Sequence, residues 1–257
     1  MRIGIIGRGT VGDAVYRGFE LLGHSMSVVD PKYSNTKLED VLDSDCVFIC
    51  VPTDQLPNGD CDTSIVESVV NDLNTAKYSG LIALKSSVVP GTCDKLSNQY
   101  KDLKICSVPE FLRARLAFED FVYNQDLLII GSTRSADYEI ITAAHGHYAK
   151  NVRYTKPIEA EIVKYFNNVN HSVQIIFANI AYDVCKKLGG DYSVVYEAIT
   201  SRECFNPAYL DCNENLRGFG GHCLPKDTSA WNNLVKNLGL KYTMIQAAID
   251  DNRELKK

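Results

Sequence analysis

The residues best suited to chemistry lie in a glycine-rich stretch late in the chain, residues 218–227, which reads GFGGHCLPKD. Cys223 is a potential nucleophile, and Lys226 follows it by three residues. Asp227 stands where a helix N-cap is expected, so Cys223 is predicted to lie on a tight turn just before a helix. A helix N-terminus and a nearby ammonium both favour the reactive thiolate form of a cysteine. A glycine-rich turn around a buried, inert cysteine explains the same residues, so this stretch alone leaves both interpretations open.

Composition limits the class of protein. The 257 residues, 45% of them hydrophobic, can form one large domain or two smaller ones. A net charge of -5 with no basic run argues against nucleic-acid binding, and no apolar stretch approaches the ~20 residues of a membrane span. Met1 leads directly into a predicted strand, so we expect no signal peptide. Nine scattered cysteines without a CxxC pair indicate reduced thiols in a cytoplasm and no metal site.

The chain opens with a dinucleotide-binding pattern. An apolar strand at residues 2–6 leads into GRGTVG at residues 7–12, a helical repeat follows, and a second strand at residues 25–29 ends at Asp30. The glycines permit the tight turn and the approach of a pyrophosphate, while an acid about 20 residues on binds the ribose hydroxyls. Asp30 would repel a 2′-phosphate, which favours NAD over NADP, although Lys32 lies close by. The expected cofactor-binding residues here are Gly7, Gly9, Thr10, Val11, Gly12 and Asp30.

Further strands are expected at residues 45–51, 81–84, 104–108 and 127–130, separated by helices. This alternation predicts an α/β fold with a Rossmann-type, doubly wound parallel sheet, and ligands bind such sheets at the carboxyl ends of the strands. Polar or turn residues follow three of the strands at that edge: Pro52 and Thr53; Ser86 and Ser87; Pro109 and Glu110. Each group could be ordinary turn chemistry, but their common edge favours a role in lining the site.

The second half is predicted to be helical. Pro157 opens a long helix that meets no breaker until Gly189, and apolar residues recur along it every three or four positions. Lys164 and Asn168 lie one turn apart, away from the apolar stripe. They are either part of a solvated helix face or, if the Cys223 stretch packs over them, two donors aimed at one oxygen. We therefore expect a cofactor domain at residues 1–154 and an all-helical domain with one long central helix at residues 155–257.

Five motifs in order resemble those of the nucleotide-sugar (UDP-glucose/GDP-mannose) 6-dehydrogenases. The 218–227 stretch resembles the family signature GxGGxCxPKD. The other four are Val51-Pro52-Thr53, the 85–92 segment KSSVVPGT, the 109–113 segment PEFLR with Asp120-Phe121, and the 159–165 segment EAEIVKY with Asn168. The resemblance spans residues 3 to about 252, which makes chance an inadequate explanation.

The resemblance implies oxidation of a sugar CH2OH to a carboxylate with two NAD+, most simply UDP-glucose to UDP-glucuronate. Cys223 would capture the aldehyde as a thiohemiacetal, and a second hydride transfer would give a thioester that water releases. Lys164 and Asn168 would stabilise the oxyanion. The remaining implied roles are water positioning and proton transfer by Ser87, Glu110 and Asp227, contacts to the cofactor by Ser87, Val51, Pro52, Thr53 and Lys226, and substrate binding by Glu110, Phe111, Leu112, Arg113, Lys164, Asn168 and Gly220. The long helix suggests a homodimer formed through the helical domain.

Several features depart from the family pattern. Ala114 replaces a second glutamate, Ser87 replaces a threonine while keeping the hydroxyl, and His222 resembles a different branch of the family from Pro225. Substrate contacts in residues 202–216 cannot be assigned. Family members also carry a third, nucleotide-binding domain, whereas this chain ends in helical register. It is therefore either a piece of a longer protein or a minimal version whose nucleotide site is missing or comes from another chain.

Two other functions remain open. A β-hydroxyacid-type dehydrogenase pairs a similar cofactor domain with a helical domain, uses a Lys-x-x-x-Asn pair such as Lys164 and Asn168, and transfers one hydride. It fits the length but has no use for Cys223. A non-catalytic NAD-binding remnant is favoured by Ala114 and the missing domain, and opposed by the intact Cys223 and its neighbours.

Overall fold

The computed structural model describes residues 1–33, 35–203, 205 and 207–257. Its internal contacts divide the chain into two compact units. The first unit comprises Met1–Asp54 and Asp62–Lys164, and the second comprises Gln55–Cys61 and Tyr165–Lys257. The division runs through the long helix instead of preceding it, and it assigns the short 55–61 segment to the second unit.

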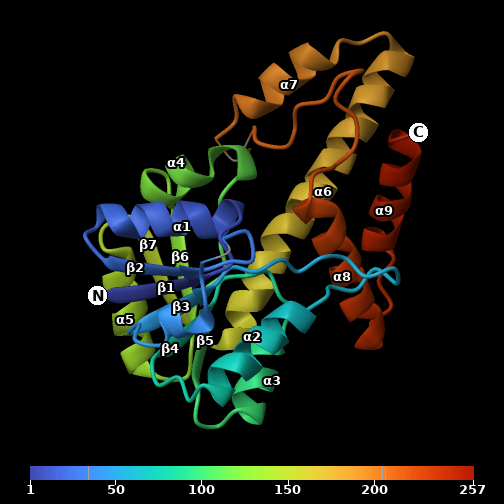
Figure 1. The fold of residues 1–257 in the computed structure, drawn as a ribbon. Coiled ribbons are helices and arrows are strands. Elements are labelled where there is room, and N and C mark those ends of the chain that lie inside the picture. The colour runs from blue at the N-terminus through green and yellow to red at the C-terminus, as the bar shows by residue number, and fades with distance from the viewer. Residues whose placement is uncertain (34, 204, 206) are drawn as a thin grey trace. The chain divides into compact units, whose positions relative to one another are not determined.

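A single seven-stranded sheet forms the centre of the first unit (Figure 1). Its strands are apolar and almost wholly buried near the middle, as expected of a sheet covered on both faces. They are β1 (Arg2–Ile6), β2 (Ser25–Val29), β3 (Cys46–Ile49), β4 (Leu81–Leu84), β5 (Lys104–Ser107), β6 (Leu127–Gly131) and β7 (Asn151–Thr155), in the spatial order β2-β1-β3-β4-β5-β6-β7.

The far edge of the sheet differs from the expected all-parallel arrangement. Strands β2, β1, β3, β4 and β5 are parallel to one another. Strand β6 pairs with β5 in antiparallel fashion through Ser107 and Gly131, and β7 is parallel to β6. An antiparallel edge on an otherwise parallel sheet is common. The sequence also did not predict β7, because its residues NVRYT are mostly polar and lack an apolar run. The Rossmann-type α/β class is confirmed, with two strands reversed at one edge.

Helices cover both faces of the sheet, as the doubly wound pattern predicts. Residues of α1 (Thr10–Leu21), α4 (Ala117–Val122) and α5 (Ser135–His145) share one apolar cluster with the sheet. Residues of α2 (Ser64–Thr75) and α3 (Thr92–Gln99) share the cluster on the opposite face. Two short 3-10 helices, η1 (Leu38–Val41) and η2 (Ala114–Leu116), lie in the connections.

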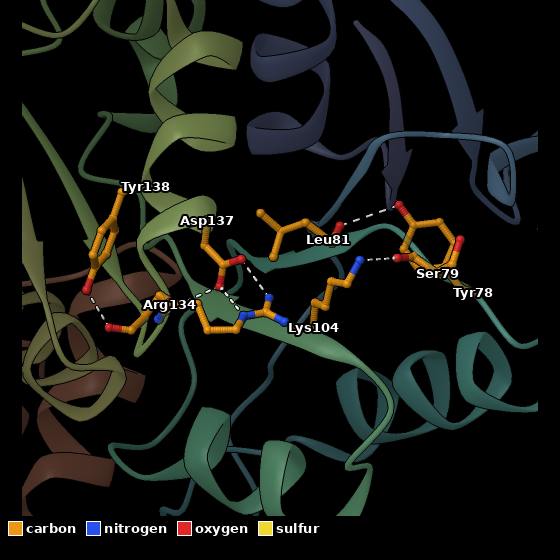
Figure 2. A network of polar contacts seen from close by, with 8 residues as sticks. Tyr78, Ser79, Leu81, Lys104, Arg134, Asp137 and Tyr138 are labelled. Carbon is orange, nitrogen blue, oxygen red and sulfur yellow. Dashed lines mark hydrogen bonds and ion pairs between the residues drawn. The ribbon is translucent and has the colours of Figure 1, made fainter.

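Polar contacts fasten the connections around this sheet, as Figure 2 shows. Arg134 grips the carboxylate of Asp137 with Nε and Nη2, at 3.1 and 2.6 Å, in the first turn of α5. On the neighbouring strand β5, Lys104 Nζ donates to the carbonyl of Ser79 at 2.9 Å. These contacts hold the loop before α5 and the segment before β4 in place beside the sheet.

The second unit is built from helices (Figure 1). The helix α6 (Pro157–Leu188) begins in the first unit and continues into the second, where α7 (Tyr192–Thr200), α8 (Cys223–Asn237) and α9 (Met244–Leu255) follow. Ile176 of α6, Phe219 and Ala248 of α9 form a small buried cluster. The start at Pro157 and the stop before Gly189 confirm the predicted bounds of the long helix.

The sequence left open whether the polar face of α6 is exposed to solvent. In the structure this face is buried. Glu161, Lys164 and Asn168 are 2%, 8% and 5% exposed. Several apolar residues of the predicted stripe are instead exposed: Ile158, Ile162, Phe166, Ile180, Val184 and Leu188. The polar face is therefore the one that the fold encloses. Within the described part of the chain, no helix, α6 included, combines the length and the apolar character needed to cross a membrane.

Candidate functional site

The turn between β1 and α1 has the close packing that a dinucleotide-binding turn needs. Gly7 has a φ of +89°, and a Cβ there would lie 2.8 Å from the backbone of Cys50. A Cβ at Gly12 would lie 1.9 Å from the carbonyl oxygen of Gly7, so only glycine fits. At Gly9, in contrast, none of the described residues has a heavy atom within 4 Å of an added Cβ. The chain is thus tight at two glycines and open at the third, which fits a pyrophosphate at the start of α1.

Asp30 lies directly after β2, where the ribose-binding acid is expected. Its carboxylate accepts the backbone N–H of Arg8 at 2.5 Å and that of Lys32 at 2.8 Å. The side chain is nearly buried, and the two backbone donors fix its orientation beside the glycine turn. This geometry fits the hydroxyls of a nicotinamide cofactor's ribose.

The strand ends that follow β3 and β4 are joined to each other. Thr53 donates its hydroxyl to the carbonyl of Ser87 at 2.8 Å, and Ser86 donates to the carbonyl of Val51 at 2.7 Å. The structure therefore brings together two of the predicted segments, as their common edge implied.

Glu110, at the end of the segment after β5, is held by a buried lysine. Lys85 Nζ lies 2.9 Å from Glu110 Oε2, and the lysine side chain is fully buried. The same ammonium lies 5.6 Å from the ring centroid of Phe121, close enough for a cation–π contact. The other carboxylate oxygen, Oε1, accepts the N–H of Phe111 at 3.0 Å. In the sequence, Lys85 stood out only as part of a motif. The feature that could have indicated its burial is its place directly after four apolar residues.

Arg113 makes a two-pronged contact that the resemblance did not predict. Its Nε and Nη2 donate to the Asp120 carboxylate at 2.8 and 2.7 Å, and its backbone N–H donates to the same group at 2.9 Å. The arginine next to it lowers the pKa of Asp120. Arg113 thus closes the loop between residues 113 and 120, and any contact that it makes with a substrate is additional to this pair.

Lys164 and its neighbour Glu161 connect the first turns of α6 to the rest of the first unit. Lys164 Nζ lies 5.4 Å from the ring centroid of Phe111. Glu161 accepts the backbone N–H groups of Gly91 at 2.6 Å and Cys93 at 2.9 Å. At the start of α3 these donors have no partner within the helix, so the carboxylate caps it. Burial raises the pKa of Glu161 to about 7, against the opposing effect of these two hydrogen bonds. No local pattern indicated that Glu161 caps a helix 70 residues away.

In the second unit, Asp227 belongs to a buried cluster of polar side chains. Asn168 Nδ2 donates to Asp227 Oδ2 at 2.6 Å, and Lys226 Nζ donates to Asp227 Oδ1 at 2.6 Å. One turn further along α6, the hydroxyls of Ser172 and Thr228 are hydrogen-bonded at 2.7 Å. The N-cap prediction for Asp227 was wrong: α8 begins at Cys223, its N-cap residue is His222, and Asp227 lies in the second turn. Proline at position 225 is compatible with the first turn of a helix, which explains the earlier start.

Cys223 is the first residue of α8 and is exposed. The other seven cysteines that the structure describes are buried or half-buried, and burial raises the pKa of Cys46, Cys93 and Cys106 well above the ordinary value. Cys223 therefore combines exposure with the positive end of a helix, which are the conditions for a reactive thiol. The buried-cysteine alternative does not hold for it. Gly218 and Gly221, with φ of +61° and +76°, give the preceding loop its turns.

Two further regions bear on the site predictions. A cavity of about 450 Å³ lies in the second unit between the end of α6, the start of α7 and residues 211–213, and it contains none of the residues expected to do chemistry. In the 202–216 segment, whose contacts the sequence left open, residues 204 and 206 lie outside the described residues. The described part of the chain shows no cluster of metal-ligating side chains.

Two models of one protein family match this chain. Residues 32–149 match the NAD binding domain of the UDP-glucose/GDP-mannose dehydrogenase family, and residues 158–254 match the central domain of the same family. The chain belongs to the UDP-glucose/GDP-mannose dehydrogenase family. It carries the family's cofactor domain, and NAD is the cofactor that this domain binds.

Individual relatives agree with this family. A UDP-glucose 6-dehydrogenase of Rickettsia bellii is 29% identical over 87% of this chain and 52% of its own length. UDP-glucose 6-dehydrogenase AglM of Haloferax volcanii is 28% identical over 98% of this chain and 69% of its own. The chain spans about half the length of most of the curated relatives it matches.

Solved structures extend the comparison to the fold. A UDP-glucose dehydrogenase from Pyrobaculum islandicum superimposes with a TM-score of 0.89 at 28% identity, covering 98% of this chain and 68% of that one. A 3-hydroxyisobutyrate dehydrogenase from Mycobacterium tuberculosis gives a TM-score of 0.75 at 16% identity, covering 97% of this chain and 91% of that one. The second likeness shows a shared fold alone, since its sequence identity is low.

Proposed function

We propose that this chain takes part in the NAD-dependent oxidation of the primary alcohol of a nucleotide sugar to a carboxylate, with UDP-glucose as the first candidate substrate. One observation carries the proposal: an exposed cysteine begins α8, and Asp227, four residues on, is bound to Asn168 of α6. A dehydrogenase that stops at the aldehyde has no use for such a thiol.

The chemistry assigned to Cys223 accounts for four electrons. The alcohol first loses a hydride and a proton to give an aldehyde, and the thiolate then adds to its carbon to form a thiohemiacetal. Loss of a second hydride leaves a thioester, and attack by water breaks the C–S bond to give the carboxylate and the free thiol. NAD+, when bound, accepts the hydride in each of the two oxidations.

The neighbouring residues have separate roles in this proposal. Lys164 and Asn168, one turn apart on α6, donate to the oxygen that becomes negative when the thiolate adds, and one such donor is typically worth about a hundred- to a thousandfold in rate. An amide nitrogen carries two protons, and the one not given to Asp227 is the donor assigned to the oxyanion. Asp227, Glu110 and Ser87 position the hydrolytic water and take up its proton.

A β-hydroxyacid-type oxidation is the second candidate. Its support is the shared fold with the 3-hydroxyisobutyrate dehydrogenase, of whose length this chain covers 91%. It would use Lys164 and Asn168 in one hydride transfer and leave Cys223 without a role.

The two candidates predict different products from the same assay. Purified protein of this length, given UDP-glucose and excess NAD+, should form two NADH per sugar, whereas a β-hydroxyacid oxidation gives one NADH from a small hydroxyacid. Cys223→Ser should stop turnover in the first case and leave the second almost unchanged. Cys185→Ser, a half-buried cysteine in the same unit, is the matched control. NAD+ binding without oxidation of any nucleotide sugar would favour a non-catalytic NAD-binding protein.

We also propose that two copies associate through α6. The exposed apolar residues of this helix, among them Phe166 at 67% and Leu188 at 82%, form a surface that a second copy would cover. Light scattering measures the mass directly, and a monomer at micromolar concentration would exclude this arrangement.

A further inference from the structure

The residues around Asp30 contain both signals by which such domains distinguish NAD from NADP. An acid after the second strand binds the ribose 2′-hydroxyl of NAD, whereas a nearby arginine accommodates the 2′-phosphate of NADP. This chain has the acid, Asp30, and it also has an arginine close by, Arg8, whose backbone N–H donates to Asp30 Oδ2 at 2.5 Å. The position of the Arg8 side chain therefore bears directly on the choice between the two cofactors.

The guanidinium of Arg8 is held on α1. Its Nε donates to Asp13 Oδ1 at 3.0 Å, and its Cζ lies 3.9 Å from the ring centroid of Tyr16. Tyr33, from the loop after β2, lies on it at a longer 5.7 Å. An ion pair and a stacked ring together fix a flexible cation and offset its charge.

We propose that Asp13 is a specificity-determining residue for the cofactor, because it binds the Arg8 guanidinium and so keeps that group from serving a 2′-phosphate. The preference for NAD then rests on two acids with different actions. Asp30 repels the phosphate directly, and Asp13 binds the guanidinium of Arg8, the residue whose backbone N–H donates to Asp30. This inference concerns cofactor choice and does not depend on the sugar chemistry proposed above.

A second arginine also reaches Asp13. Arg17 Nη1 lies 3.8 Å from Asp13 Oδ2, and its guanidinium lies 4.1 Å from the ring centroid of Phe118. The contact between Arg17 and Asp13 is longer than that of Arg8, and the Arg17 residue has no contact with Asp30 among the bonds described. A test must nevertheless separate the two arginines, which a double variant does.

The experiment measures binding of NAD+ and of NADP+ to the full chain by calorimetry, without turnover. Asp13→Asn keeps the shape of the side chain and removes its charge. We expect the ratio of NADP+ to NAD+ affinity to rise about ten- to a hundredfold, the usual effect of one hydrogen bond to a charged group. In the double variant Arg8→Gln/Asp13→Asn that gain should disappear.

Asp45→Asn is the matched control, because Asp45 is also paired with an arginine in the first unit, Arg2, at the opposite end of the strands. It should leave the ratio unchanged. The proposal is overturned if Asp13→Asn changes the ratio no more than this control does. It is equally overturned if the gain persists in the double variant, since the charge at position 13 would then act without Arg8. Thermal melting of each variant confirms that the compared proteins are folded.

Discussion

Asn168 and Asp227, 59 residues apart in sequence, share a 2.6 Å hydrogen bond that joins α6 to α8 inside the second unit. Asp227 also accepts from Lys226, so one buried carboxylate receives an amide and an ammonium at once. A carboxylate satisfied at both oxygens is held in one orientation, and with it the first turns of α8, where Cys223 lies. The positions of the proposed nucleophile and of one oxyanion donor are therefore mechanically linked.

Removing Asp227 should strongly destabilise the protein. Asp227→Ala leaves the Lys226 ammonium, whose side chain is 6% exposed, without its partner, and breaking a buried ion pair in this way typically costs about 3–5 kcal/mol. Urea unfolding of the wild type and of Asp227→Ala measures the difference in unfolding free energy. Glu214→Ala, which breaks the exposed pair with Lys186, should leave the unfolding midpoint essentially unchanged. Equal midpoints for all three proteins would contradict the buried arrangement.

The pair of Lys85 and Glu110 can be tested by a double-mutant cycle. Lys85→Met should destabilise the protein by about 3–5 kcal/mol, because the Glu110 carboxylate would stay buried without its cation. Combining it with Glu110→Gln should recover much of that loss, since no unpaired charge then remains. Under the proposed chemistry the double variant stays inactive despite its recovered stability. Additive losses of unfolding free energy would show that the two side chains are not coupled.

Glu161 should give the stability a specific pH dependence. Its pKa in the folded protein is raised from 4.5 to about 7, so its contribution to stability is fully present below about pH 4.5 and is lost as the pH rises through about 7. The difference corresponds to about 3 kcal/mol in the free energy of unfolding. Urea titrations from pH 4.5 to 8 should show this decline in the wild type and not in Glu161→Gln.

Glu159→Gln is the control for that experiment, because Glu159 lies two residues earlier on the same helix and is exposed. Its stability should follow the wild-type curve across the pH range. If Glu161→Gln also runs parallel to the wild type, the buried carboxyl does not titrate in this range and the capping contact to Gly91 and Cys93 is not pH-sensitive.

Two glycines of the first turn should respond in opposite ways to the same added methyl group. Gly12→Ala places a Cβ 1.9 Å from the Gly7 carbonyl oxygen, so we expect a clear loss of thermal stability. Gly9→Ala meets no described atom within 4 Å, so the protein should melt near the wild-type temperature while NAD+ binds more weakly. Thermal melting and calorimetric titration with NAD+ measure both effects. Unchanged NAD+ affinity in Gly9→Ala would mean that the open space is not used by the cofactor.

Features that depend on local pattern could be predicted from the sequence alone. The glycine turn, Asp30 after β2, the alternating strands and helices, and α6 from Pro157 to the residue before Gly189 all follow from residue periodicity and from the backbone demands of proline and glycine. The family could also be recognised, because its motifs are short local stretches in a fixed order. These features require no knowledge of which distant residues meet.

Only the tertiary structure decided the features that depend on long-range contact. It showed that the polar face of α6 is buried and that β6 is antiparallel to β5. It also showed that Asp227 binds Asn168 and Lys226 instead of capping α8. The reason is physical: a helical repeat defines two faces but not which one is covered, and a buried charge is tolerated only where its partner, often far along the chain, comes within hydrogen-bonding distance.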